Sequence, residues 1–265
     1  MKRIEAVFGG LRGRGEKALI PFITAGDPDL ETTYELALAM AARGADILEL
    51  GIPFSDPLAD GPTIQAASNR AIRNGVHLED VLTLAGKLRR ATDMPLVLMG
   101  YYNPILQYGL ERTAQEASRQ GVDGFIIPDL PVEEAAAWRQ AALAAGVAPI
   151  FLAAPTSGAR RIRKLGALTR GFLYYVSVTG ITGARAELPL ELVSELQEVR
   201  RLVHCPVAVG FGISNPEQVR MLAPLVDGVV VGSAIVQRVA KLRGEALLNE
   251  IGELVAALKT PLRKG

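Results

Sequence analysis

The 265-residue sequence has one cysteine, Cys205, and two histidines, His77 and His204. A single cysteine excludes an internal disulfide and fits a reducing compartment. Neither histidine lies beside carboxylates at the spacing of metal ligands, and no Ser-His or Cys-His nucleophile can be assembled from these residues. The chain also lacks a signal segment and an apolar run long enough to cross a bilayer. We therefore expect a cytoplasmic protein without a metal site.

An excess of charge of either sign is missing as well. The 29 Lys and Arg residues balance 28 Asp and Glu residues, which leaves a net charge of +1 at pH 7. Because the two signs are interspersed, the electrostatics favour neither nucleic acid nor a membrane as a partner. Apolar residues make up 49% of the chain, and no linker or change of composition divides it. We expect a single domain over residues 1–265.

What is present is a regular alternation of short apolar runs and segments of helical period. Strands are predicted at Ala18–Thr24, Asp46–Gly51, Pro95–Met99, Gly124–Ile127, Ala148–Ala153, Gly171–Ser177, Pro206–Gly210 and Gly228–Val231. Helices between them include Leu30–Arg43, Val132–Ala145, Pro189–Leu202 and Pro216–Leu222. Eight such units in about 250 residues predict an α/β protein, a (β/α)8 TIM barrel, here with an extra N-terminal helix. A doubly wound open sheet is the competing fold, although it more often has fewer strands and a Gly-rich first turn.

Unusual residues gather where the predicted strands end, which is the active face of a TIM barrel. The segments that follow strands one to six are Thr24–Asp27, Ile52–Gly61, Tyr101–Pro104, Pro128–Pro131, Pro155–Ser157 and Thr179–Glu187. The turns at the opposite end, such as Ala41–Gly44, are plain connectors. Asp27, Asp56 and Asp129 lie in the active-face loops, where ordinary turn chemistry explains them equally well.

Glu49 is the most informative residue, because its strand is otherwise apolar at Ile47, Leu48 and Leu50. A carboxylate there costs several kcal/mol unless it is paired, neutralised or used. Asp60 follows eleven positions later, in the loop after the same strand, so both acids could face one pocket. Burial should raise the pKa of Glu49, whereas Asp60, nearer solvent, should stay ionised. A structural ion pair is the alternative for Glu49, but no Arg or Lys in the facing strands offers itself.

Two glycine-rich passages, Gly210–Ser214 and Gly228–Ile235, lie at the last two predicted strands. Each leads into a helix start, whose free N–H groups favour an anion, so together they predict a phosphate site. Tight turns alone are the alternative reading. The lysines lie in helices, tails or strand entrances, which argues against a Schiff base. Carboxylates, tyrosines, hydroxyls and amides remain, and they support acid–base chemistry on a phosphorylated substrate.

Six segments that together span essentially the whole chain resemble the tryptophan synthase alpha subunit family. These segments are Pro21–Pro28, Glu49–Gln65, Ile127–Pro131, Gly180–Gly183, Gly210–Ser214 and Gly232–Val236. The second is the most specific. The resemblance implies retro-aldol cleavage of indole-3-glycerol phosphate to indole and D-glyceraldehyde 3-phosphate in tryptophan biosynthesis. It also implies an alpha2-beta2 tetramer in which the beta subunit carries pyridoxal phosphate and receives the indole, and no cofactor on this chain.

The resemblance assigns roles to matching positions. Glu49 and Asp60 match the two catalytic acids: Glu49 would protonate indole C3 and then take the glycerol hydroxyl proton, and Asp60 would accept a hydrogen bond from the indole N–H. Tyr174 would contact the substrate and could also hydrogen-bond Glu49. The residues expected to wall the indole pocket are Phe22, Tyr101, Ile126, Leu152 and Tyr174. Those expected to hold the phosphate are Gly183, Phe211, Gly212, Gly232 and Ser233.

Three alternatives stay open at this point. The first is a stand-alone lyase without a beta partner, although the semi-apolar loops 53–57 and 102–108 resemble the family's partner-contacting surface. The second is a sugar-phosphate isomerase on a related barrel, which would need an aspartate within the first strand, where Ile20–Ile23 has none. The third is a catalytically idle barrel that only binds and regulates a partner, against which the presence of Glu49 and Asp60 argues.

Overall fold

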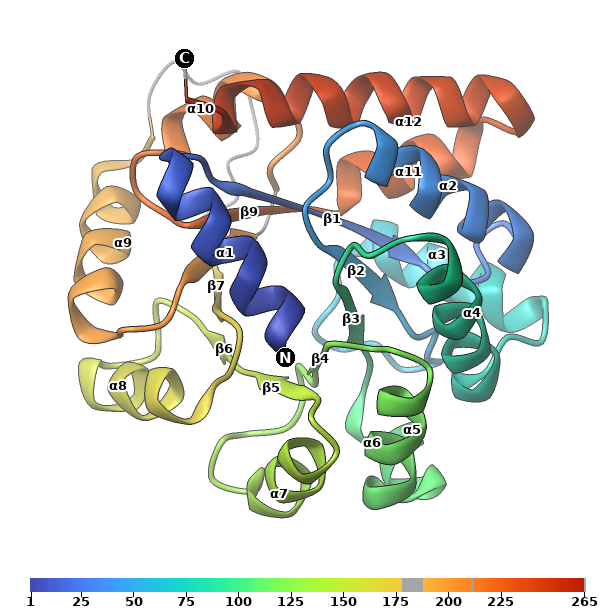
Figure 1. The fold of residues 1–265 in the computed structure, drawn as a ribbon, viewed down its shortest axis with the longest axis horizontal. Coiled ribbons are helices and arrows are strands. Elements are labelled where there is room, and N and C mark those ends of the chain that lie inside the picture. The colour runs from blue at the N-terminus through green and yellow to red at the C-terminus, as the bar shows by residue number, and fades with distance from the viewer. Residues whose placement is uncertain (178–187, 211, 265) are drawn as a thin grey trace.

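The computed structural model describes residues 1–177, 188–210 and 212–264 (Figure 1). Within these ranges, nine parallel strands follow the order β5-β4-β3-β2-β1-β9-β8-β7-β6. They are β1 Ala18–Thr24, β2 Leu48–Gly51, β3 Leu96–Met99, β4 Gly124–Ile126, β5 Ala148–Ile150, β6 Leu152–Ala153, β7 Leu173–Val176, β8 Val207–Gly210 and β9 Gly228–Val231. The two ends of this order, β5 and β6, are neighbours in the chain with only Phe151 between them. The sheet is therefore a barrel, and the predicted TIM barrel is confirmed.

The predicted fifth strand, Ala148–Ala153, is divided into β5 and β6, which is why nine strands replace eight. β5 pairs with β4, whereas β6 pairs with β7. The break falls at Phe151, whose N–H donates to the side-chain hydroxyl of Thr169 at 3.1 Å instead of to a neighbouring strand. A hydroxyl eighteen residues away thus interrupts a ladder that the local sequence predicts to be continuous.

Helices surround the barrel (Figure 1). They are α1 Lys2–Arg14, α2 Leu30–Ala42, α3 Pro62–Arg73, α4 Leu78–Ala91, α5 Tyr102–Tyr108, α6 Leu110–Arg119, α7 Ala136–Ala144, α8 Ala159–Leu168, α9 Leu190–Leu202, α10 Pro216–Leu222, α11 Ser233–Lys241 and α12 Gly244–Lys259, followed by a 3-10 turn at Thr260–Leu262. α7 begins four residues later than predicted, because 132–135 form turns. No helix in the described ranges is both long and apolar enough to traverse a bilayer.

The N-terminal helix α1 covers one end of the barrel (Figure 1). Ile4, Phe8 and Leu11, spaced along one helix face, are buried against interior residues of the barrel such as Ile20 in β1 and Ile47 just before β2. These interior residues lie toward the strand starts, so α1 closes the amino end of the barrel. The opposite, carboxyl end of the strands is the one left for the loops of the active face.

Register fixes the direction of Glu49. Ile47 belongs to the interior cluster, whereas Leu48 and Leu50 belong to the cluster between the strands and the surrounding helices. Because successive side chains in a strand alternate, Glu49 shares the interior face with Ile47, one layer nearer the carboxyl end. The residue of β1 in register with Glu49 is Phe22. A carboxyl group therefore enters the barrel interior directly above the apolar core.

The loop after β1 is tied to helix α3. Arg70 on α3 donates twice to the carboxylate of Asp27, at 2.7 Å for each oxygen, and Asp27 is buried. The Asn74 amide donates to the carbonyls of Gly26 and Pro28. Removing one partner of a buried pair leaves an uncompensated charge, so this clamp holds α3 firmly against the end of β1. Asp27 thus has a structural partner.

Candidate active site

Glu49 is fully enclosed at the carboxyl end of β2, with 1% of its surface exposed. Its Oε2 atom has no hydrogen-bond partner among the described residues. Burial first, and the negative charge of Asp60 second, raise the pKa of Glu49 to about 8. At neutral pH the carboxyl group therefore holds a proton that it can donate.

Asp60 lies in the loop between β2 and α3 and is half-buried. The phenol of Tyr101 donates to its Oδ2 at 3.1 Å, and the Gln65 amide donates to its backbone carbonyl at 2.8 Å. Burial raises the pKa of Asp60 to about 6, an effect that the Tyr101 hydrogen bond partly offsets. Asp60 is less enclosed than Glu49, in line with the expectation that it lies nearer solvent. The ionised form still predominates at pH 7.

Two tyrosines complete the polar part of this region. The Tyr101 phenol also accepts a hydrogen bond from the Ala59 N–H at 3.0 Å, and its ring stacks on Phe54 with centroids 5.1 Å apart. Tyr174 on β7 is in register with Leu152, and burial, Glu49 and Asp60 all raise its pKa. Both acids are thus close enough to Tyr174 to interact electrostatically. The predicted hydrogen bond between Tyr174 and Glu49 is absent from the described contacts.

The ring of Phe22 lies between Gly51 at the end of β2 and Gly232 directly after β9. A Cβ on Gly51 would lie 2.6 Å from its ring, and a Cβ on Gly232 would lie 3.3 Å from it. Gly232 immediately precedes α11, which begins at Ser233 and has no side-chain cap. The N–H groups of this first turn therefore have no side-chain acceptor, and a helix start of this kind favours an anion. Gly212, after β8, has φ +71°, a conformation that favours glycine.

A small cavity of about 10 Å³ lies between the ends of β1, β2 and β3. Its lining residues are Phe22, Thr24, Gly51, Ile52, Asp60, Ile64, Ser68, Met99 and Tyr101. The hydroxyl-bearing members Thr24 and Ser68 were not among the predicted site residues. Thr24 does begin one of the active-face segments singled out in the sequence, whereas Ser68 stands two turns into a helix, where nothing local distinguishes it.

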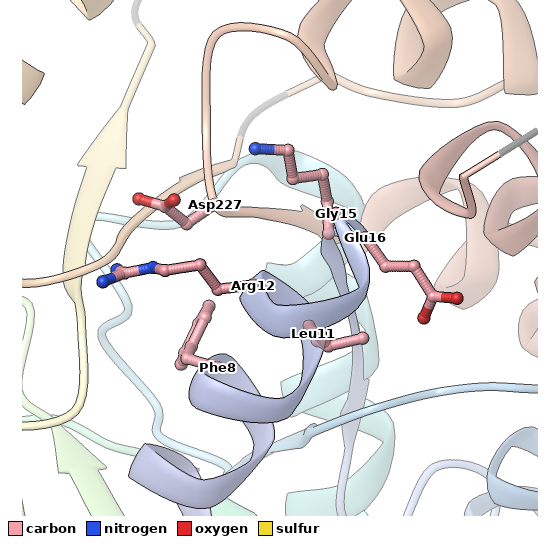
Figure 2. A pocket seen from close by; sticks show the side chains of 7 residues that line it. Phe8, Leu11, Arg12, Gly15, Glu16 and Asp227 are labelled. Carbon is pink, nitrogen blue, oxygen red and sulfur yellow. The ribbon is translucent and has the colours of Figure 1, made fainter.

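A larger cavity of about 60 Å³ lies at the opposite end of the barrel (Figure 2). Phe8, Leu11 and Arg12 of α1 line it together with Lys17 and Asp227, which directly precede β1 and β9. The Asp227 carboxylate already accepts the Val207 N–H at 3.0 Å and faces Arg200 at 3.6 Å. These contacts are structural, and the cavity is remote from both acids.

The other predicted acids and histidines have ordinary surroundings. Asp129 accepts the backbone N–H of Tyr102 at 2.9 Å, as a turn residue does. The N–H of His77 donates to Asp80 at the start of α4. His204 lies at the amino end of β8, away from the acids. The described part of the chain contains no group of three or more His, Cys, Asp or Glu side chains arranged to hold a metal ion.

The model of the family "Tryptophan synthase alpha chain" matches residues 8–260. The tryptophan synthase alpha chain of Citrifermentans bemidjiense is 50% identical over 265 residues, which cover 100% of this chain and 99% of the relative. That of Thermoanaerobacter sp. is 47% identical over 263 residues, 99% of this chain and 100% of the relative. The chain belongs to the tryptophan synthase alpha chain family.

Solved structures of the family share the fold. The alpha subunit of Legionella pneumophila has a TM-score of 0.90 at 38% identity, with 98% of each chain covered. A chain of the Pyrococcus furiosus tryptophan synthase complex has a TM-score of 0.84 at 39% identity, covering 92% of this chain and 98% of that one. Members of the family cleave indole-3-glycerol phosphate beside a beta subunit. They carry no cofactor, because pyridoxal phosphate belongs to the beta subunit.

The structure brings some of the predicted site residues together and leaves others out. Glu49, Asp60, Tyr101, Tyr174 and Phe22 converge, as described above. Ile126 is fully buried in the interior cluster, in register with Met99 of the cavity lining, and Leu152 packs against that cluster in register with Tyr174; neither lines the small cavity itself. Gly212, Gly232 and Ser233 lie at the ends of β8 and β9. Gly183 and Phe211 lie outside the described residues.

Replacing Gly210 with alanine should displace Tyr174. A Cβ at this position would lie 2.3 Å from the Tyr174 hydroxyl and 2.9 Å from Cζ, so the ring must move away. A displacement of active-site groups by about 1 Å can lower the rate of an enzyme by about 100-fold. We therefore expect kcat/KM for indole release to fall by about 10- to 100-fold. Steady-state indole formation measures this. Adding Tyr174→Phe removes the closest atom and should restore part of the loss; no recovery would mean that the clash lies elsewhere.

Proposed function

We propose that this chain cleaves indole-3-glycerol phosphate to indole and D-glyceraldehyde 3-phosphate, with Glu49 as the acid and base and Asp60 as the acceptor for the indole N–H. The observation that carries the proposal is the enclosed Glu49 carboxyl group. It has an unpartnered oxygen, it is protonated at neutral pH, and it lies next to a second acid that is ionised. A stable structural role would give that oxygen a partner.

The chemistry follows from the poor stability of an indole carbanion. Glu49 donates its proton to C3 of the indole ring, which creates a cationic ring with its charge centred on N1. The Asp60 carboxylate accepts the N–H hydrogen bond and stabilises this charge. Glu49, now ionised, takes the proton from the hydroxyl on the carbon attached to C3. The carbon–carbon bond breaks, its electron pair returns to the ring, and the aldehyde and neutral indole are released with Glu49 protonated again.

The two acids need opposite protonation states in the free enzyme. Glu49 must hold its proton, which it does below a pKa of about 8, and Asp60 must be ionised, which it is above a pKa of about 6. The active form is therefore most populated between these values, so kcat/KM should follow a bell-shaped profile with its maximum near pH 7. Gly212, Gly232 and Ser233, with the first turn of α11, would hold the phosphate and so place the ring over the acids.

We assign the surface that contacts a beta subunit to the active-face loops. Leu58 is 93% exposed in the loop that also carries Asp60, and Leu106 on α5 is half exposed. Large apolar side chains that face water suggest an interface, and a beta subunit docked here would receive indole directly. A stand-alone indole-3-glycerol phosphate lyase is the alternative. The reducing environment that suits a lone Cys205 supports a cytoplasmic setting for either.

Indole formation with and without a beta subunit tests the proposed function. The purified chain should release indole from indole-3-glycerol phosphate slowly. A saturating beta subunit from a relative should raise this rate at least about tenfold, because a partner that holds the active-face loops closed would complete the catalytic site. Leu58→Ser should weaken this stimulation, whereas Glu5→Ser, at an exposed position of α1 over the opposite end of the barrel, should not. No indole under any condition contradicts the function; full unassisted turnover favours the stand-alone lyase.

A further inference from the structure

Two buried side-chain atoms in the described part of the chain have no hydrogen-bond partner. One is Oε2 of Glu49, and the other is the hydroxyl oxygen of Thr24. Thr24 is the last residue of β1, where it pairs with Gly51, and only 3% of its surface is exposed. Both atoms lie at the carboxyl end of the barrel. The coincidence suggests that Thr24, like Glu49, finds its partner when the site is occupied.

Other buried threonines of this chain do find partners within the fold. The Thr33 hydroxyl donates to the Asp29 carbonyl at 2.7 Å and accepts the Gly26 N–H at 3.0 Å. The Thr113 hydroxyl donates to the carbonyl of Gly109 at 2.9 Å. A buried hydroxyl without a partner destabilises the folded state, whereas valine would fill the same space without leaving a polar atom unpaired. Stability therefore does not explain a threonine at position 24.

The small cavity identifies what Thr24 faces. Its lining includes Thr24, Asp60, Tyr101 and Ser68, and its volume of about 10 Å³ is close to that of one water-sized sphere. Among the described contacts, Tyr101 donates to Oδ2 of Asp60, and Oδ1 accepts no hydrogen bond. An acceptor that lacks a donor and a hydroxyl that lacks a partner therefore line the same narrow space.

We propose that Thr24 is a positioning residue for the reaction: with substrate bound, its hydroxyl donates a hydrogen bond to the Asp60 carboxylate across this cavity, directly or through one water molecule. Tyr101 holds one carboxylate oxygen and Thr24 holds the other. The pair orients Asp60 toward the indole N–H and keeps it ionised. The inference rests on the proposed function, in which Asp60 acts as the hydrogen-bond acceptor.

In the part of the chain that the structure describes, few other groups can hold the second carboxylate oxygen of Asp60. The titratable groups that face it there are Glu49 from β2, Tyr101 after β3 and Tyr174 from β7. Among the described residues, none of the causes that set the pKa of Asp60 is a cation. Burial disfavours the carboxylate and the Tyr101 hydrogen bond favours it, so neutral hydroxyl donors are the groups that stabilise it. Losing one of two such donors should therefore change both the rate and its pH dependence.

Thr24→Val, which keeps the shape and removes the hydroxyl, tests the proposal. We expect kcat to fall by about 10- to 100-fold with a smaller change in KM, because a hydrogen bond to a charged group is lost in the transition state. The acidic limb of the kcat profile should move up by about one pH unit. Thr24→Ser, which keeps the hydroxyl, should stay within a few-fold of the original chain.

Two controls separate positioning from packing. The free energy of unfolding of the Thr24→Val chain should be unchanged or higher, since an unpartnered hydroxyl is removed. In an Asp60→Asn background the same substitution should cost less than about twofold, because the residue through which Thr24 acts is already altered. An equal loss in both backgrounds, or a Thr24→Val chain with unaltered kcat and pH profile, overturns the inference. Failure of the original chain to release indole would instead overturn the proposed function.

Discussion

Replacing Glu49 with glutamine is expected to lower indole formation from indole-3-glycerol phosphate by at least about three orders of magnitude, with the fold retained. Glutamine has nearly the same shape but can neither donate the proton to C3 nor accept one from the glycerol hydroxyl. A single positioned acid or base contributes about 10²- to 10⁴-fold, and here one carboxyl group serves both steps. Steady-state indole release, measured with a saturating beta subunit, gives the loss directly.

Glu195→Gln is the matched control for this substitution. The Glu195 carboxylate accepts the Tyr175 hydroxyl at 2.9 Å on the helix side of the barrel, and the glutamine carbonyl can accept the same hydrogen bond. That chain should keep activity within about twofold, because surface-side substitutions of this kind have small effects. Activity of Glu49→Gln within tenfold of the original chain would remove Glu49 from the chemistry.

The same substitution should stabilise the protein in a pH-dependent way. The pKa of Glu49 is raised from 4.5 to about 8 by folding. Between these values the folded state keeps a proton that the unfolded state has lost, so the unfolded chain binds fewer protons and stability falls as pH rises. Below about pH 4.5 the carboxyl group is protonated in both the folded and the unfolded state, so it adds no pH dependence to the unfolding free energy. The gain in unfolding free energy of Glu49→Gln should therefore increase from pH 5 to pH 8, as urea unfolding would measure.

Much of the fold is predictable from local patterns in this chain. β1 and β9 have the predicted bounds, because short buried apolar strands between turn residues leave little choice of ends. Glu49 stands out for an equally local reason, a carboxylate in an apolar strand. The division of the fifth strand at Phe151 could not be predicted, since it depends on Thr169, which the chain brings close only when the barrel closes.

Details of the site are predictable only in part, for the same reason. The inward turn of Asp60 depends on Tyr101, 41 residues away, and the clamp on Asp27 depends on Arg70, 43 residues away. Threonine at a strand end is ordinary, so only the absence of a partner in three dimensions distinguishes Thr24. Local sequence identifies which residues are chemically unusual; the contacts that orient them are long-range.

Replacing Asp60 with asparagine should lower kcat/KM by about 100- to 1,000-fold, a smaller loss than at Glu49. Asparagine can still accept the indole N–H through its carbonyl oxygen, but it carries no negative charge to stabilise the cationic ring. Removing one preorganised electrostatic group from an active site costs about this much. The pH profile should change shape as well: the acidic limb, set by the pKa of about 6 of Asp60, should disappear, and the limb at about 8 set by Glu49 should remain. Initial rates of indole release across pH 5–9 measure both effects.

Asp129→Asn is the control that makes this profile decisive. Asp129 follows β4 and accepts the Tyr102 N–H, a hydrogen bond that the asparagine carbonyl can also accept, so its rate and both limbs should be retained. If the acidic limb persists in the Asp60→Asn chain, another group sets it, and Asp60 is not the ionised acceptor. If the acidic limb disappears in the Asp60→Asn chain and persists in the Asp129→Asn chain, the charge of Asp60 itself stabilises the protonated indole, and the general negative potential of the active face does not.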